Sequence, residues 1–418
     1  CDAKTGVFIN SLFEETHANY VQPLHPMLFI KDRSGEFLWR SERDGFDHLY
    51  RYNIQGDLLN QVSKGKWVVK EFLAFNGKDV IFTGTSKNGL ETQIFKSPLN
   101  TSRSAMISKN EGIHRPQVNQ GGNLILDSYN SLNNSGSIDL IDSSGKKIKN
   151  LLQSKDLFKN TLLGKTELFS IKAEDKTLLN CRMIKPNNFD SNKKYPCLVY
   201  VYNGPGVQLI YNSNLASASL WMHYMANTYD YIVFTIDGRG SENRGSEFEQ
   251  AIFRNLGQIE MQDQLLGVNH LKSLKYVDPN KIALHGWSYG GFMTTNLLCS
   301  YPDIFTCGVA GGPVIDWKFY EVMYTERFMD TPESNPEGYE NANLLNKAKN
   351  LQDDLLIIHG TSDDVVVWQH SLAFVEKCIS AGIQMDYFPY PGHPHNVRGK
   401  DRIHLMQKVI DYIVDNNH

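Results

Sequence analysis

The segment Gly286–Gly291, with the sequence GWSYGG, constrains the fold more than any other part of this chain. The apolar run Ile282–Leu284 precedes it, and Phe292–Leu298 follows with a composition typical of a helix. A Gly-x-Ser-x-Gly turn between a strand and a helix bends so sharply that its serine hydroxyl stands clear of the sheet. The alternative is a chance glycine-rich turn, which does not call for both flanking elements. We therefore expect Ser288 to be an exposed nucleophile at a strand–helix turn.

Apolar, strand-like runs alternate with longer amphipathic stretches from about residue 160 onward. Such alternation indicates a mainly parallel sheet with helices on both faces. Two earlier runs, Glu167–Lys172 and Leu178–Ile184, predict an antiparallel hairpin at the start of the sheet. Together with the serine turn, the pattern predicts an α/β fold with an α/β-hydrolase domain over residues 156–418. The other expected strands are Cys197–Val201, Tyr231–Thr235, Ile282–Leu284, Gly308–Ala310 and Leu355–Ile358, and the clearest helices are Gly257–Leu274 and Gln369–Ala381.

Residues 1–155 carry a different pattern, in which short strands are separated by turn signals. Phe37–Ser41 and His48–Tyr52 flank the dipeptide Asp44-Gly45, a strong signal for a β-hairpin. A repeat of about 40–50 residues with several strands is typical of β-propeller blades. About three such repeats are present, too few to close a ring, so we expect the carboxyl-terminal part of a propeller whose first half lies upstream. The recurring outer strands, about 45 residues apart, are His48–Tyr52, Gln93–Ser97 and Ile138–Asp142.

Composition narrows the classes of partner. The chain has 418 residues, 41% hydrophobic and 21% charged, which suits a soluble globular protein of two domains. A net charge of −4 gives no reason to expect nucleic acid, and no apolar run approaches the roughly 20 residues that span a bilayer. The six cysteines show no metal-ligand spacing, so we expect no metal and no cofactor. A disulfide between Cys299 and Cys307 is left open.

A serine nucleophile needs a neighbouring base, itself oriented by a carboxylate. In an α/β-hydrolase the acid and then the histidine follow the serine along the chain, each after a strand. Two acids, Asp363 and Asp364, follow the next-to-last expected strand, and His393 and His395 follow the last one, Met385–Tyr390. Position alone separates neither the two acids nor the two histidines.

Several longer motifs carry a family resemblance. GWSYGGFM, DGRGSENRG, VYNGPG, YTERFM and HGTSDD together resemble the dipeptidyl peptidase IV family of the prolyl oligopeptidase clan. GGPVIDW, NPEGYENANLL, VVVWQHSL and HPHNV are more similar to its bacterial branch, the prolyl tripeptidyl peptidases. ETHANYVQPLHP and SERDGFDHLYRY extend the likeness into the first 155 residues, so that it covers essentially the whole chain.

The resemblance implies a role for each of the catalytic residues. It makes Ser288 the nucleophile, Asp363 the orienting acid and His395 the general base. The backbone amide of Tyr289 and the hydroxyl of Tyr202 would hold the oxyanion. Without the resemblance, Tyr202 would be an ordinary tyrosine at a strand end.

The resemblance also implies a pocket for proline, a rigid apolar ring that suits aromatic walls. Core packing is the alternative for these aromatic residues. Glu321 matches a carboxylate that helps to hold the substrate's amino terminus in the tripeptidyl enzymes, the alternative being a surface glutamate. Val365 stands where the dipeptidyl members have an asparagine, a departure that favours the tripeptidyl branch. The expected pocket residues are Trp317, Tyr320, Tyr324, Tyr289, Val314 and Val366.

The function implied by the resemblance is that of a serine exopeptidase. It would cleave peptides after a proline near their amino terminus and release Xaa-Xaa-Pro tripeptides through an acyl-enzyme. The alternatives are release of Xaa-Pro dipeptides, a broader acylaminoacyl peptidase or esterase, and an inactive binding protein. We expect a periplasmic, cell-surface or secreted location, with the targeting segment upstream, and a homodimer stays open.

Overall fold

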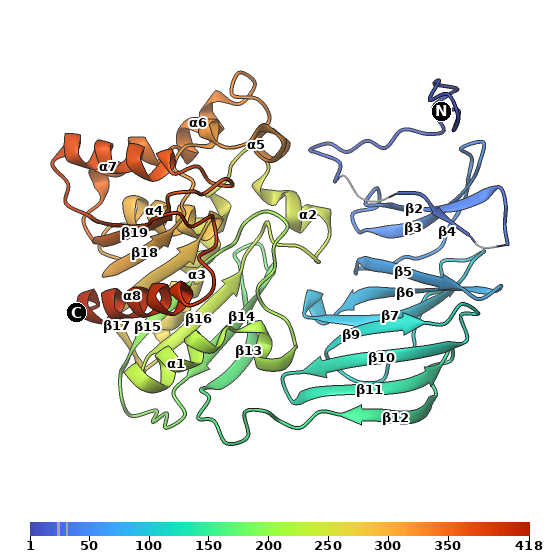
Figure 1. Ribbon diagram of the computed structural model, residues 1–418, viewed down its shortest axis with the longest axis horizontal. Coiled ribbons are helices and arrows are strands. Elements are labelled where there is room, and N and C mark those ends of the chain that lie inside the picture. Colours follow the sequence, from blue (N-terminus) through green and yellow to red (C-terminus); the bar gives the residue numbers. More distant parts are fainter. Residues whose placement is uncertain (23–25, 31) are drawn as a thin grey trace. The chain divides into compact units, whose positions relative to one another are not determined.

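The computed structural model describes residues 1–22, 26–30 and 32–418 and divides into two compact units (Figure 1). Pro23–His25, within the motif ETHANYVQPLHP, lie outside the described residues. Unit 1 comprises Cys1–Leu157 together with the short segments Tyr211–Asn214 and Glu242–Glu249. The sequence pattern predicts one boundary, between residues 155 and 156, and does not foresee that these two segments belong to unit 1. Unit 2 comprises Phe158–Ile210, Leu215–Ser241 and Gln250–His418.

Unit 1 is built from three antiparallel runs of four strands. The first run forms its own sheet, and the other two share a sheet that is joined through one parallel pairing, Thr92 with Ile113. The runs are β1 (Leu28–Phe29), β2 (Glu36–Ser41), β3 (His48–Asn53) and β4 (Leu58–Gln61); β5 (Val69–Phe75), β6 (Asp79–Ser86), β7 (Glu91–Pro98) and β8 (Ala105–Met106); and β9 (Ile113–Val118), β10 (Leu124–Ser131), β11 (Asn134–Asp142) and β12 (Lys147–Gln153).

The hairpin predicted around Asp44-Gly45 is confirmed, because β2 pairs with β3 in antiparallel register from Glu36–Asn53 to Ser41–His48. The three recurring strands are β3, β7 and β11, and they are third in each run rather than outermost. Each pairs on both sides, the outer neighbours being β4, β8 and β12. The sequence hides these edge strands because β8 has only two residues and β12 is exposed throughout. The described strands fit blade-like repeats, and closure into a propeller stays a prediction.

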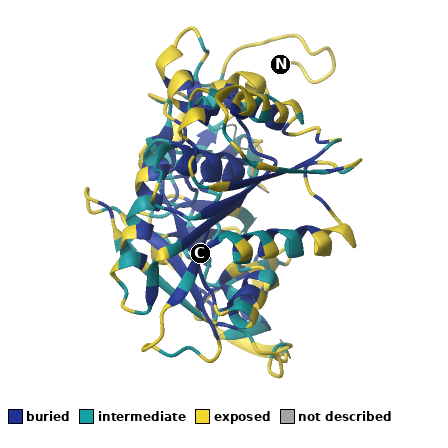
Figure 2. Cartoon of the chain, turned by 90° about the vertical axis from the view of Figure 1, so that its left-hand side faces the viewer, coloured by how far each residue is buried: buried dark blue, intermediate teal, exposed yellow. Residues whose placement is uncertain are grey.

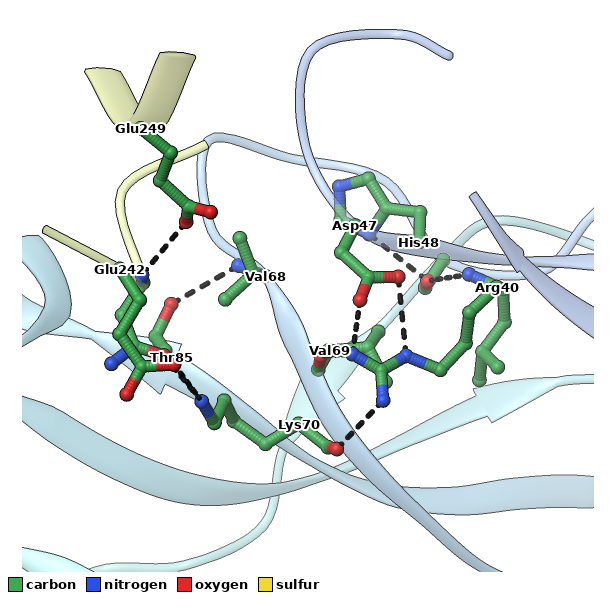
Figure 3. Close-up of polar contacts among 12 residues, drawn as sticks. Arg40, Asp47, His48, Val68, Val69, Lys70, Thr85, Glu242 and Glu249 are labelled. Carbon is green, nitrogen blue, oxygen red and sulfur yellow. Dashed lines mark hydrogen bonds and ion pairs between the residues drawn. The ribbon is translucent and has the colours of Figure 1, made fainter. Parts of the chain in front are cut away.

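Polar contacts hold the segment Glu242–Glu249 within unit 1 (Figure 3). Lys70 Nζ lies 3.3 Å from Glu242 Oε2 and donates to Asn243 Oδ1 at 2.6 Å. The backbone N–H of Asn243 in turn donates to Glu249 Oε1 at 2.9 Å. Burial, together with the nearby charges of Glu42 and Glu242, raises the pKa of Glu249 to about 8. Burial therefore favours the protonated form of Glu249 over a wider pH range than for an exposed glutamate.

Lys70 is itself positioned by its neighbours in the strands. Arg40 pairs with Asp47 through two contacts, one of them between Nε and Oδ1 at 3.1 Å. The same guanidinium donates to the backbone carbonyls of Val69 and Lys70, at 2.7 and 2.9 Å. Figure 3 shows how Arg40 bridges the end of β2 to the start of β5 in this way.

Unit 2 contains an eight-stranded mixed sheet in the order β13-β14-β16-β15-β17-β18-β19-β20. β13 and β14 form the predicted antiparallel hairpin, β14 pairs antiparallel with β16, and the remaining pairings are parallel. The mainly parallel α/β arrangement is thus confirmed. The strands are β13 (Lys165–Lys172), β14 (Leu178–Lys185), β15 (Tyr195–Tyr200), β16 (Ile232–Asp237), β17 (Val277–Trp287), β18 (Cys307–Gly311), β19 (Asp354–Gly360) and β20 (Asp386–Tyr390).

Helices cover both faces of this sheet (Figure 1). α1 (Leu220–Tyr229) and α8 (Asp401–Asn416) share one hydrophobic core with inward-facing residues of the strands, among them Leu198, Val309 and Ile358. α4 (Tyr289–Ser300) packs on β17 and β18 from the other face, and α3 (Ile259–Ser273) and α7 (Gln369–Ala381) accompany it. Figure 2 shows the central strands buried and the outward faces of the helices exposed. Shorter helices are α2 (Ser246–Glu249) in unit 1 and α5 (Val322–Met329) and α6 (Pro336–Ala342) in unit 2.

Candidate active site

Ser288 is the single residue between the end of β17 and the start of α4. Its backbone has φ 62° and ψ −118°, a conformation that costs a residue with a side chain about 1–3 kcal/mol. The Ser288 amide donates to the carbonyl of Gly311 at 2.7 Å, which fixes the turn. A Cβ on Gly286 would lie 2.3 Å from the carbonyl oxygen of Gly290 and 2.4 Å from that of Val201. The flanking glycines are thus required because three segments of backbone meet at this turn.

Asp363 follows β19, and its fully buried carboxylate accepts four hydrogen bonds. Oδ1 accepts from the amides of Val365 and Val366, both at 2.9 Å. Oδ2 accepts from His395 Nδ1 at 2.6 Å and from His359 Nε2 at 3.1 Å. Burial alone would raise the pKa of Asp363, but the hydrogen bonds from His359 and His395 hold it well below its ordinary value. The carboxylate is therefore ionised at neutral pH.

The two candidate histidines have different partners. His395 contacts Asp363, and its backbone carbonyl accepts from Trp287 Nε1 at 2.9 Å. A Cβ on Gly312 would lie 3.2 Å from His395 Cε1, so this glycine leaves room for the imidazole ring. His393 lies on the exposed side of the loop, where its Nε2 is 3.0 Å from Asp401 Oδ2. Since His395 Nδ1 donates to Asp363, Nε2 is the ring nitrogen left to accept a proton.

Ser288 and His395 line one cavity of about 490 Å³. Tyr202, two residues beyond β15, lines it as well. Burial, with smaller effects of nearby tyrosines, raises the pKa of Tyr202 to about 12, so its hydroxyl keeps the proton that it could donate. Tyr289 is the first residue of α4, a position whose backbone amide has no acceptor within the helix. Of the two predicted oxyanion donors, Tyr289 is thus adjacent to Ser288 in the chain, and Tyr202 lines the same cavity as Ser288.

The predicted proline-pocket residues form an aromatic cluster, of which one member faces the cavity. Trp317 stacks on Tyr324 with ring centroids 5.9 Å apart and meets Tyr320 edge-on at 5.7 Å. Tyr320 lines the cavity, and Val365 lines it too. Tyr324 is half-buried. The other members, Trp317, Tyr289, Val314 and Val366, are buried behind this surface.

Glu321 is exposed and begins α5 as its cap. Its Oε2 accepts a hydrogen bond from the amide of Met323 at 3.0 Å, and Glu321 is not among the residues that line the cavity. A carboxylate at the first turn of a helix is stabilised by the unpaired amides there. The predicted role of Glu321 in holding a substrate's amino terminus stays a prediction.

Two buried residues that support the site were missed from the sequence. His359, at the end of β19, contacts Ser371 Oγ at 2.7 Å through Nδ1 and the Val366 carbonyl at 2.8 Å through Nε2. These partners fix Nε2 as the donor towards Asp363. The histidine that opens the motif HGTSDD, four residues before Asp363, was the available signal.

The second missed residue is Glu260 of α3, which holds the ring of Tyr289. Its Oε1 accepts from the Tyr289 hydroxyl at 2.6 Å and from the Gly257 amide at 3.0 Å. Burial raises the pKa of Glu260 to about 7. The local sequence, GQIEMQDQ, is mostly polar and gave no signal that this glutamate is buried.

The structure also bears on metal-binding clusters, disulfides and membrane-spanning helices. In the part of the chain that the structure describes, no cluster of histidine, cysteine or acidic side chains could hold a metal ion. Cys299 and Cys307, like the other four cysteines, are free thiols. Among the described helices, none has both the length and the apolar character needed to cross a bilayer.

A serine at a strained strand–helix turn, beside a paired histidine and aspartate, defines the class of the α/β-hydrolases with a serine nucleophile. Comparison of the sequence with family models gives two matches. Residues 216–417 match the prolyl oligopeptidase family, and residues 1–135 match the dipeptidyl peptidase IV N-terminal region. The catalytic unit is thus similar to serine peptidases of the prolyl oligopeptidase family, and the first 135 residues are similar to the amino-terminal region of dipeptidyl peptidase IV.

Solved structures and curated relatives agree with this placement. The crystal structure of a putative dipeptidyl aminopeptidase IV from Bacteroides ovatus is 42% identical, with a TM-score of 0.92 over 96% of this chain and 60% of that one. Porphyromonas gingivalis dipeptidyl peptidase 4 is 30% identical, with a TM-score of 0.86 over 93% of this chain and 55% of that one. Dipeptidyl peptidase 4 of Felis catus is 30% identical over 403 residues, which are 92% of this chain and 52% of the relative. The chain thus spans about half the length of these relatives.

Proposed function

We propose that the protein is a serine exopeptidase that cleaves peptides after a proline near their amino terminus. The observation that carries the proposal is the short hydrogen bond between His395 and the ionised Asp363, in the cavity that Ser288 also lines. A buried, ionised carboxylate on Nδ1 orients the imidazole and stabilises its protonated form. That pairing makes a neutral His395 an effective base for a serine hydroxyl.

The reaction follows from these roles. His395 Nε2 takes the proton of Ser288 as Oγ attacks the carbonyl carbon of the scissile bond. The Tyr289 amide and the Tyr202 hydroxyl donate to the oxygen that becomes negative. His395 then gives its proton to the departing amine, which leaves an acyl-enzyme on Ser288. Water, activated by the same histidine, releases the acyl part and restores the serine.

Specificity for proline is supported by the aromatic cluster next to Ser288. A proline ring is apolar and has no amide hydrogen that a pocket must satisfy. Tyr320 would meet it at the cavity wall, and Trp317 and Tyr324 hold Tyr320 in place from behind. The name of the matching family, prolyl oligopeptidase, supports the same preference.

Within this activity we propose release of tripeptides. Support comes from the motifs of the bacterial branch and from Val365, an apolar residue on the cavity wall that cannot replace the amide of the dipeptidyl members. Glu321 would hold the substrate's ammonium group after giving up its hydrogen bond to Met323. The names of the relatives favour a second candidate, release of Xaa-Pro dipeptides. An exported location belongs to the same proposal and rests on the family resemblance.

Two chromogenic substrates decide between the candidates. The full-length protein is assayed on Ala-Ala-Pro-p-nitroanilide and Gly-Pro-p-nitroanilide. We expect cleavage of both to depend on Ser288 and kcat/KM to be higher for the tripeptide. A preference for Gly-Pro would replace tripeptide with dipeptide release, and equal cleavage of matched substrates with alanine in place of proline would refute proline specificity.

A further inference from the structure

Side chains from opposite faces of the sheet meet at the cavity around Ser288, with Tyr320 as the lining member of the aromatic cluster. The aromatic cluster packs on the side of α4, where Trp317 contacts Phe292 with ring centroids 5.3 Å apart. A second group comes from α1 and α8, which cover the other face, and consists of Trp221, Arg402, Leu405 and Met406. Ser288 directly follows the central strand β17, so side chains from both faces of the sheet can reach its cavity.

Arg402 is the one permanently charged side chain among the described residues of the cavity wall. It is exposed in the first turn of α8, and no hydrogen bond or ion pair of its guanidinium occurs within the described ranges. The adjacent carboxylate, Asp401, is taken by His393 at 3.0 Å. An arginine without a carboxylate partner beside a catalytic serine has its full binding capacity available for a ligand.

The surroundings of Arg402 strengthen its attraction for an anion. Trp221, Leu405 and Met406 provide apolar walls, which weaken screening by water. His285 also lines the cavity, and burial lowers its pKa to about 4, an effect to which Arg402 adds. His285 is therefore neutral at physiological pH and does not share the positive charge.

If the proposed function holds, the side chains from α1 and α8 lie on the side of Ser288 where the departing part of the substrate is bound. The acyl half carries the proline and occupies the aromatic cluster on the α4 side. The departing peptide must then extend from Ser288 towards the α1–α8 side. His395, which gives its proton to the departing amine, lines the same cavity.

We infer that Arg402 forms a subsite for a carboxylate of the departing peptide. A guanidinium presents paired N–H donors that match a carboxylate in two parallel hydrogen bonds. The carboxylate can be the carboxyl terminus of a short peptide or an acidic side chain of a longer one. Substrates with either group at this distance should be cleaved faster than their neutral counterparts.

The test compares matched peptides on the full-length enzyme. One pair is Ala-Ala-Pro-Ala-Ala with a free carboxyl terminus or an amide. The other is Ala-Ala-Pro-Ala-Glu-Ala-amide and its Gln counterpart. A solvent-exposed ion pair should favour the carboxylate about two- to fivefold in kcat/KM. In Arg402→Gln this ratio should fall to about one, while Arg398→Gln, a charge loss four residues away in the exposed loop, should keep the wild-type ratio.

Each outcome has a defined meaning. A preference in the first pair alone identifies the terminal carboxylate as the ligand, and one in the second pair alone identifies the side chain. Equal rates within both pairs, or a preference that survives Arg402→Gln, would overturn the inference. Prolyl nitroanilides have no departing peptide, so their cleavage tests the proposed function independently of this subsite. If they are cleaved but neither peptide pair shows a carboxylate preference, the subsite is refuted and the proposed function stands. Without proline-specific cleavage both proposals fall.

Discussion

Replacing Asp363 with asparagine tests the central hydrogen-bond network. Oδ2 of Asp363 accepts from two imidazole N–H groups, those of His359 and His395, and Oδ1 accepts from two backbone amides. In Asp363→Asn the two amides can keep the oxygen, so an NH₂ group must face both imidazoles. His395 can then stay in contact only with Nδ1 as the acceptor, which places its proton on Nε2 and removes the base.

The expected loss follows from this change of tautomer. The equivalent substitution in a serine protease triad lowers kcat about 10⁴-fold. At 1.36 kcal/mol for each factor of ten, that is about 5 kcal/mol of transition-state stabilisation. We expect Asp363→Asn in the full-length enzyme to lose a similar factor in kcat on a prolyl nitroanilide, with a smaller change in KM.

Asp364→Asn is the matched control, because Asp364 is the adjacent, exposed acid. It should keep activity close to the wild-type level. Circular dichroism of both variants separates lost chemistry from lost folding. Asp363→Asn with more than a tenth of the wild-type kcat, or an equal loss in Asp364→Asn, would refute the assignment of the orienting acid.

Three further predictions concern single groups. His395→Ala should lose nearly all turnover and His393→Ala little, in kcat on a prolyl nitroanilide; the reverse order would exchange their roles. Tyr202→Phe should lower kcat about 100- to 1000-fold, as expected for one oxyanion donor, and an unchanged kcat would leave Tyr202 a packing residue. Because the pKa of Glu249 is raised in the folded protein, this carboxyl loses its proton at a lower pH in the unfolded chain than in the folded one. The free energy of unfolding should therefore fall as the pH rises from about 4.5 to about 8. The fall should be at most about 1.4 kcal/mol per pH unit. Glu249→Gln should flatten that slope in urea unfolding at pH 5 and 8, and an unaltered slope would place the titration elsewhere.

The nucleophile turn could be predicted from the sequence because its geometry depends on residue type. Gly286 and Gly290 lie where any Cβ would collide with backbone carbonyls, so a chain that makes this turn has glycine at both positions. The alternating strands of unit 2 could be predicted for a similar reason. Strands buried on both faces contain continuous apolar runs, as in β18 and in Leu355–Ile358 of β19.

The partners within the site could not be predicted from position. Asp363 and Asp364 are adjacent in sequence, and only the fold brings the first under His395 and leaves the second exposed. The same holds for His393 and His395. The family resemblance selected Asp363 and His395, and the hydrogen bonds are an independent reason for the same choice.

The sequence also did not predict which individual side chains are buried. The motif around Trp317 does not tell which aromatic ring reaches the cavity, and Tyr320 does so while Trp317 is buried. Glu321 could be placed next to the aromatic cluster, but its hydrogen bond to Met323 depends on where α5 begins. Glu242–Glu249 belongs to unit 1 and makes contacts with residues far away in the chain, such as Asn243 with Lys70 and Ser246 with Gly45.

The central claim is that Ser288 is an activated nucleophile, and covalent labelling tests it most directly. The full-length protein and its Ser288→Ala variant are treated with a fluorophosphonate, digested, and analysed by mass spectrometry. The account predicts one adduct, on the peptide that contains Ser288, and none in the variant. Labelling of a different residue, or equal labelling of Ser288→Ala, would contradict it.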